Sequence, residues 1–370
     1  MTSAELATRW IAAQPHLQQL HALRMTWRSA EVMPLPPQLT ELHVELKPVD
    51  FTAPDSNNWD LRPIDSFAAS LGLASCAASL VSLDISLFFP DCSANLLRLM
   101  HSVSQLQQLT SLRLEQTYSL EDLSWPAEQW PLVRSLRRLR HLMLHNLKPT
   151  DLSLVLAEPV AFPELHTLNA NYIHPHCSGG IVAHGARLCT LRCNYEFAEA
   201  PAFLLQLPQL SELDVWLESP ALLDELLEVL PHCRALTSLH LPYVPRCYMT
   251  GSQLQRLLPQ MPQLRALSLF RPKPTDWSWL RCAPQLTQLR LFNSHITLAK
   301  VEQLAHCPRL TRLSLSSDRC FWNVPKEEHA ELMQALRVRL DPRSPTRDRA
   351  LLPALREMSF DDSNRGDPYS

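Results

Sequence analysis

The sequence contains little glycine, no Cys-x-x-Cys pair and no long apolar run. Six glycines in 370 residues leave no glycine-rich loop of the kind that cradles phosphates. The ten cysteines include no Cys-x-x-Cys pair and are too sparse for a disulfide framework, which favours a reducing compartment. No run approaches the roughly 18 apolar residues of a membrane span, and no secretory signal is evident at the N-terminus. We therefore predict a cytoplasmic protein without a membrane partner.

The charge balance and the motif inventory exclude further classes of function. The formal net charge is -3, with 34 basic and 37 acidic residues, so no whole-protein field attracts nucleic acid and we predict no nucleic-acid partner. No Gly-x-Ser-x-Gly, His-Glu-x-x-His or Gly-x-x-x-x-Gly-Lys pattern occurs. We therefore predict a protein that is not an enzyme, with no catalytic residues and no cofactor.

One spacing dominates what the sequence does contain: Leu, two residues, Leu, one residue, and Leu or a substitute. A spacing of three and then two suits neither one long helix nor one long strand, but it is typical of a short strand entered through a turn in a stacked array. Thirteen copies occur, most of them separated by 19 to 30 residues. Their first leucines are Leu20, Leu39, Leu80, Leu109, Leu139, Leu165, Leu188, Leu210, Leu236, Leu264, Leu286, Leu310 and Leu355.

The segments between the copies predict helices that return the chain to the next strand. Apolar residues at three-four spacing indicate helices over 95–106, 221–230, 253–261 and 298–306. In the two long intervals, a helix is expected over 64–78, and a further copy at Met333-Leu336-Val338 is an alternative to a helix there. We predict three parts: a capping helix over 1–19, the array of about 13 repeats over 20–360, and a disordered tail over 361–370.

The motif resembles that of the leucine-rich repeat superfamily. The resemblance implies an α/β solenoid with a curved parallel sheet inside and helices or irregular segments outside. The segments around Cys233, Cys282 and Cys307 are similar to the cysteine-bearing repeats of F-box substrate adaptors, although no F-box is recognised. These likenesses imply a monomeric protein-protein interaction scaffold or adaptor. The alternatives are the substrate receptor of a ubiquitin ligase and a regulator that wraps one target, as ribonuclease-inhibitor-like proteins do.

Strand alternation predicts which side chains the inner, concave face presents to a protein partner. If the second and third leucines of each copy point into the core, the residue between them and the residue after them face solvent. The residue after them becomes aromatic late in the array, beside charged neighbours, which is typical of interface hot spots. The predicted partner-binding residues are Trp216, Phe270, Phe292, Arg290, Asp214, Tyr243, His240 and Arg192. The alternative is that the aromatic rings fold back over the edge of the core.

A His/Cys cluster and an arginine cluster do not predict a binding site. His174 and His176, with cysteines nearby, contain metal-ligand residue types but no known ligand spacing, so we predict no metal site. Arg134, Arg137 and Arg138, followed by Arg140, favour a solvated helix face over a phosphate-binding patch.

Overall fold

Each copy of the motif forms one strand of a parallel sheet in the computed structural model. The model describes residues 21–27, 33–46, 71–87, 93–116, 130–145, 149–156, 161–173, 176–217, 219–241, 249–270, 277–292, 297–316, 334, 338, 340 and 352–361. Among these residues, thirteen strands form a sheet in the order β1-β3-β5-β6-β7-β8-β9-β10-β11-β12-β13-β14-β15. The strand count therefore equals the motif count. The chain divides into two compact units, Met1–Asn194 and Tyr195–Ser370.

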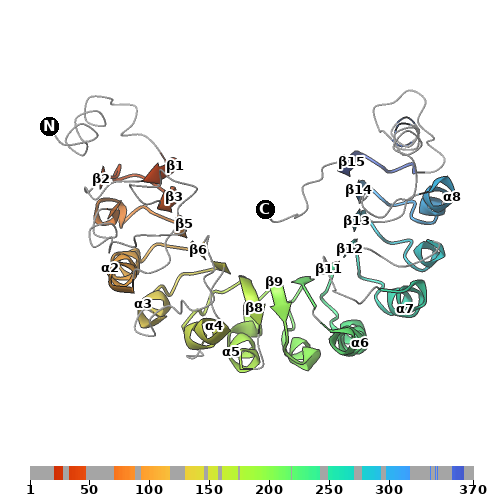
Figure 1. The fold of residues 1–370 in the computed structure, drawn as a ribbon, viewed down its shortest axis with the longest axis horizontal. Helices are drawn as coiled ribbons and strands as arrows, with labels where there is room; N and C mark the ends of the chain where they lie inside the picture. Colours follow the sequence, from red (N-terminus) through yellow and green to blue (C-terminus); the bar gives the residue numbers. More distant parts are fainter. Residues whose placement is uncertain are drawn as a thin grey trace, which may run out of the picture. The chain divides into compact units, whose positions relative to one another are not determined.

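The first unit holds the strands β1 to β8 and most of β9. Its strands are β1 (Ala22–Trp27), β3 (Glu41–Leu46), β5 (Ser82–Leu87), β6 (Ser111–Gln116), β7 (His141–His145), β8 (Thr167–Ile173) and β9 (Thr190–Phe197). Its helices are α2 (Ser93–Ser104), α3 (Trp130–Arg134), α4 (Pro149–Val155) and α5 (Ser178–His184), with 3-10 turns η3 (Leu73–Cys76) and η5 (Gly185–Arg187). A separate pair joins β2 (Met33–Pro34) to β4 (Leu71–Gly72). In Figure 1 these helices line one side of the unit's strands.

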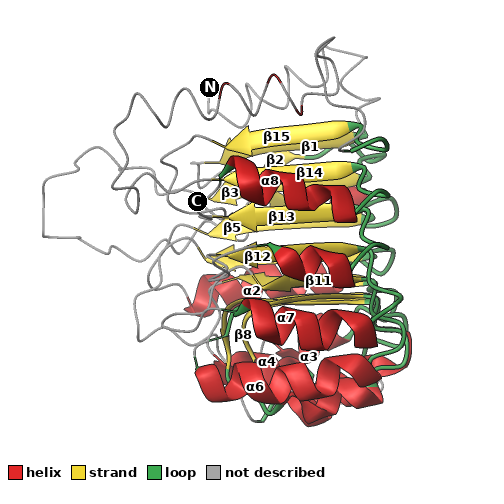
Figure 2. Cartoon of the chain, turned by 90° about the vertical axis from the view of Figure 1, so that its right-hand side faces the viewer, coloured by secondary structure: helices red, strands yellow, loops and turns green. Residues whose placement is uncertain are grey.

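The second unit repeats the same plan. Its strands are β10 (Glu212–Val215), β11 (Ser238–Leu241), β12 (Ala266–Phe270), β13 (Gln288–Phe292), β14 (Arg312–Ser316) and β15 (Glu357–Asp361). Its helices are α6 (Pro220–Val229), α7 (Gly251–Leu257) and α8 (Leu298–Glu302), with 3-10 segments η6 (Pro201–Gln206), η7 (Leu230–His232), η8 (Leu258–Gln260), η9 (Ser278–Cys282) and η10 (Gln303–His306). Within each unit the strands point the same way, with the turns at their starts (Figure 2).

The register matches the motif from strand to strand. In the first unit Leu83 pairs with Leu112, which pairs with Leu142 in turn. In the second unit Leu267 pairs with Leu289 in the same way. These leucines are at most 1% exposed, so the second position of the motif forms a continuous buried column in each unit. Burial of a leucine side chain is worth about 1.5–3 kcal/mol, and each repeat adds its share.

The turn before most of the described strands is tied to the preceding repeat by one shared carbonyl. The backbone N–H groups of Thr287 and Gln288, for example, both donate to Arg265 O, at 2.8 and 3.0 Å. The Thr287 hydroxyl donates to the same oxygen at 3.2 Å. Threonine recurs at this place in other repeats, and Thr311 donates to Thr287 O at 3.0 Å. The pattern explains why each strand starts at the same depth and why the register does not slip.

Two of the predicted cysteine positions are core positions, and the third is not. Cys233 and Cys307 lie three residues before a first leucine, where their carbonyls accept from Leu236 and Leu310 at 3.0 Å. Burial raises the pKa of the Cys233 thiol to about 11 and that of the Cys307 thiol to about 12, so both are packing residues. In the repeat whose first leucine is Leu286, that buried place belongs to Ala283, and Cys282 lies one residue earlier, partly exposed.

Several predicted segments are confirmed and others are corrected. The predicted helices over 95–106, 221–230, 253–261 and 298–306 correspond to α2, α6, α7 with η8, and α8 with η10. The helix predicted over 64–78 is wrong where the structure describes it, because 71–72 forms β4 and 73–76 is a 3-10 turn.

The remaining predictions of chain organisation have separate outcomes. The additional copy near Met333 is not supported, since Val338 is helical and β14 pairs directly with β15. The predicted capping helix and nearly all of the predicted tail lie outside the described residues, so the division into cap, array and tail stays a prediction. Within the described part of the chain, no helix is long and apolar enough to cross a bilayer.

Candidate functional site

The side of the sheet opposite the helices carries the residue between the second and third motif leucines, and we call it the open face. In the first unit this column runs in register through Arg24, His43, Asp84, Arg113, Met143 and Asn169. In the second unit it runs through Asp214, His240, Ser268, Arg290, Ser314 and Ser359. The predicted register of the column is therefore confirmed within each unit, but the expected exposure is wrong for Asn169 and Ser268, which are buried.

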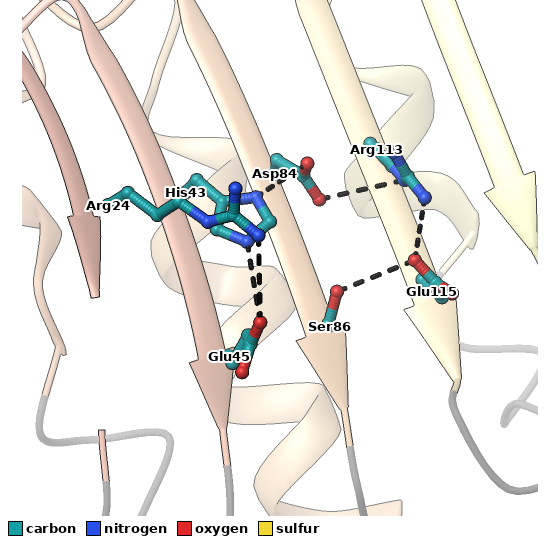
Figure 3. A network of polar contacts seen from close by, with 7 residues as sticks. All are labelled: Arg24, His43, Glu45, Asp84, Ser86, Arg113 and Glu115. Carbon is teal, nitrogen blue, oxygen red and sulfur yellow. Dashed lines mark hydrogen bonds and ion pairs between the residues drawn. The ribbon is translucent and has the colours of Figure 1, made fainter. Parts of the chain in front are cut away.

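In the first unit the open face carries a chain of polar side chains, the polar network, across β1, β3, β5 and β6. The network comprises Arg24, His43, Glu45, Asp84, Ser86, Arg113 and Glu115 (Figure 3). At its centre, His43 Nδ1 lies 2.7 Å from Asp84 Oδ2. On the other side of that carboxylate, Arg113 Nε lies 3.8 Å from Asp84 Oδ1. Asp84 is thus held between two groups from the neighbouring strands.

Two glutamates complete the polar network one step further along the strands. Arg113 donates to Glu115 Oε2 at 2.8 Å, and Ser86 Oγ donates to the same oxygen at 3.5 Å. Glu45 Oε1 lies 3.9 Å from both Arg24 and His43 Nε2. Cross-strand pairs of opposite charge each contribute about 0.2–1 kcal/mol at partly exposed positions. Three carboxylates and two guanidiniums meet beside His43, so the network is close to electrically neutral.

His145, on β7, extends this region of the open face. Burial lowers the pKa of its imidazole, and the positive charge of Arg113 lowers it further, while Glu115 and Asp84 act in the opposite direction. The ring is therefore held neutral in the folded protein at pH values where a free histidine begins to take up a proton.

The depressed pKa of His145 predicts a loss of stability in mild acid. Because the unfolded chain protonates this imidazole more readily than the folded chain does, the free energy of unfolding should fall as the pH drops below about 6.5. His145→Gln should reduce this fall, measured by urea denaturation between pH 7.5 and 5. His176→Gln, at an exposed position, is the control for removing an imidazole elsewhere in the same unit. Equal slopes for the wild type and His145→Gln would contradict the prediction.

The second unit brings together most of the predicted partner-binding residues. Phe270 and Phe292 are register partners at the ends of β12 and β13. Arg290 is exposed, while Asp214 and His240 are partly exposed register partners. His240 Nε2 lies 2.8 Å from Ser238 Oγ, which orients the ring along its own strand.

Three other predicted residues have different outcomes. Trp216 follows β10, is partly buried, and its carbonyl accepts from Phe197 N–H at 3.0 Å. Arg192 lies on β9, in the first unit. Tyr243 lies outside the described residues.

In the described part of the chain, no group of three or more His, Cys, Asp or Glu residues could hold a metal ion.

The polar network is the part of the face that sequence reasoning missed. Its members were predicted to point toward solvent, but the partner-binding site was assigned to residues of later copies, from Arg192 to Phe292. The available signal was charge alternation at equivalent places in successive copies, where His43, Asp84 and Arg113 follow one another.

Comparison with known proteins gives a likeness of fold alone. No family model and no curated protein matches the sequence. Among solved structures, a leucine-rich repeat protein of Leptospira interrogans is 16% identical, with 94% of this chain and 91% of that chain covered at a TM-score of 0.37. TLR13 in complex with ssRNA13 is 13% identical, at a TM-score of 0.47. The match covers 93% of this chain but only 51% of the TLR13 chain.

The feature that decides the architecture is internal to the chain. Thirteen motif copies coincide with thirteen strands that follow one another in the sheet. The fold is a leucine-rich repeat array. Its leucine-rich repeats present the polar network in the first unit and the phenylalanine pair in the second as the two candidate binding regions. The likeness to cysteine-bearing F-box repeats stays a prediction.

Proposed function

We propose that this leucine-rich repeat protein is a non-catalytic scaffold or adaptor that binds a protein partner through the open face of its sheet. The observation that carries the proposal is the pair Phe270 and Phe292. They lie side by side, and both remain partly exposed although the preceding residues, Leu269 and Leu291, are buried.

The surroundings of the phenylalanine pair suit a protein interface. Neighbouring strands lie about 4.8 Å apart, so the two rings can present one apolar surface. Arg290 is exposed two residues before Phe292, on the same face of β13. Phenylalanine and arginine are both enriched at protein interfaces, where a buried aromatic ring removes a large apolar area from water.

The finer assignments stay predictions. A scaffold of this kind can act as the substrate receptor of a ubiquitin ligase or as a regulator of one target protein. Degradation of a captured partner by the proteasome would support the first, and tight one-to-one inhibition would support the second. The expected cytoplasmic location, monomeric state and lack of a nucleic-acid or membrane partner are separate predictions.

Replacing both phenylalanines with alanine tests the proposal. Phe270→Ala/Phe292→Ala should weaken partner binding by about thirtyfold or more, which corresponds to the roughly 2 kcal/mol of a hot spot. Partners should be captured from native cells with the tagged full chain, identified by mass spectrometry, and titrated after purification.

A matched control separates the site from general hydrophobicity. Leu205 in η6 is 50% exposed in the same unit and does not belong to a strand of the sheet. Leu205→Ala should therefore keep the captured partners, and circular dichroism should show that all variants fold. If the double variant retained every partner at wild-type affinity, the binding site would lie elsewhere.

A further inference from the structure

Exposed arginines gather on the first unit at the turns that lead into β7 and β9. Arg138 and Arg140 flank Leu139, and Arg187 directly precedes Leu188. Glu164 occupies the corresponding turn of the repeat between them. We call these four residues the basic turn cluster. The sequence predicted a solvated helix face for Arg134, Arg137, Arg138 and Arg140. Only Arg134 lies in α3, and Arg138 and Arg140 belong to the turn.

Backbone hydrogen bonds hold these turns side by side. His166 N–H donates to Arg140 O at 2.8 Å, and Cys189 N–H donates to His166 O at 2.8 Å. Arg138, Glu164 and Arg187 each directly precede the first leucine of their repeat, so they occupy equivalent places in three successive turns. Adjacent strands are about 4.8 Å apart, a distance that long arginine side chains span easily.

The electrostatics of the cluster are strongly positive around one carboxylate. Arg140 Nε donates to Glu164 Oε2 at 2.9 Å. This hydrogen bond lowers the pKa of Glu164, and the charges of Arg140, Arg187 and Arg138 add to the effect. The pKa of the nearby His141 is lowered too, first by burial and then by His166 and Arg140. Three guanidiniums against one carboxylate leave two net positive charges.

We propose that the basic turn cluster is a docking site for an acidic segment of a protein, with its Asp or Glu carboxylates held by Arg138, Arg140 and Arg187. Glu164 already shows how this site holds a carboxylate. Each guanidinium carries five N–H donors in a fork that suits carboxylate oxygens. Arg140 uses Nε on Glu164, and Arg138 uses one nitrogen on Gln108, so the three side chains together have donors beyond these bonds.

The chemistry favours carboxylates over a nucleic-acid backbone. Nucleic-acid binding draws its affinity from many phosphate contacts, of the order of 6–10, and three arginines supply fewer. The chain as a whole has a formal charge of -3, so no wider field would add to the attraction of a polyanion. The cluster also lies at the starts of strands in the first unit, whereas Phe270 and Phe292 end strands of the second unit. The two proposals can therefore fail independently.

Charge-reversal variants of the full chain test the inference. Fluorescein-labelled polyglutamate serves as the probe, and binding is measured by fluorescence anisotropy at low and physiological salt. Arg138→Glu/Arg187→Glu should weaken binding at least tenfold, and Glu164→Gln should strengthen it severalfold, because the internal competitor loses its charge. Arg309 precedes Leu310 as Arg187 precedes Leu188, and it is exposed in a repeat of the second unit. Arg309→Glu is therefore the matched control and should bind like the wild type.

The measured affinities of these variants either support or overturn the proposed docking site. The inference is supported if only Arg138→Glu/Arg187→Glu loses binding to polyglutamate and Glu164→Gln binds polyglutamate more tightly than the wild type. It is overturned if the double reversal binds polyglutamate as the wild type does, or if Arg309→Glu weakens binding to the same extent. Tighter binding of a single-stranded oligonucleotide of equal charge at physiological salt would also overturn it, because the occupant would then be a nucleic acid.

Discussion

Leu289→Asp should unfold most of the second unit, with a fall in melting temperature of roughly 10–20 °C. Leu289 is fully buried, and its register partners are Leu267 and Leu313, both also buried. The substitution removes about 1.5–3 kcal/mol of burial and places a carboxylate in an apolar column, which costs several kcal/mol more. The sum is a large fraction of the about 5–15 kcal/mol that stabilises a typical domain.

The adjacent residue provides the control. Arg290 is exposed on the open face, so Arg290→Asp should change the free energy of unfolding by no more than about 0.5 kcal/mol. Hydrogen exchange should show that Leu289→Asp opens β12, β13 and β14 first, because each repeat is stabilised mainly by its neighbours. An unshifted melting temperature for Leu289→Asp, or equal damage from Arg290→Asp, would mean that the register of β13 is wrong.

The contrast between Leu289 and Arg290 also shows why the repeats could be predicted from the sequence. A spacing of three and then two fixes which residues enter the core, and one slip would move every leucine to the other face. The pattern therefore predicted the strands, the buried column and the residues of the open face. Prolines such as Pro262 and Pro284, two residues before a first leucine, also mark the turns, because proline cannot continue a helix.

Other features depend on contacts that a linear pattern does not encode. The β2 and β4 pair is two residues long in each strand, too short to show an alternation. The charge of Asp84 and the charge of Arg113 are visible in the sequence, but their meeting depends on the register of β5 and β6 and on side-chain direction. The grouping of Cys282 with Cys307 was also misleading, because it relied on the presence of a cysteine in each segment. The buried position is the one three residues before the first leucine, and Ala283 occupies it in that repeat.

Close contacts also distinguish two neighbouring glycines, Gly179 and Gly180. Replacement by alanine should change the stability of the protein in opposite directions at the two positions. Both lie in α5, where alanine is favoured over glycine by roughly 0.5–1 kcal/mol. A Cβ atom at Gly179 would meet nothing within 4 Å. A Cβ atom at Gly180 would lie 2.7 Å from Leu156 Cβ and 2.9 Å from Leu156 O. These atoms belong to or adjoin the backbone, so the clash can be relieved only by moving α5 away from the end of α4.

Gly179→Ala should therefore stabilise the protein slightly, while Gly180→Ala should destabilise it by about 1–3 kcal/mol, as overpacked cores do. Urea denaturation of the two variants, each compared with the wild type, measures the difference directly. Because the unfolded chain gains the same methyl group in both cases, effects on the unfolded state largely cancel between them. A Gly180→Ala variant as stable as Gly179→Ala would show that α5 does not pack this closely on Leu156. A loss confined to Gly180→Ala would confirm that this glycine sets the distance between successive repeats at that point in the array.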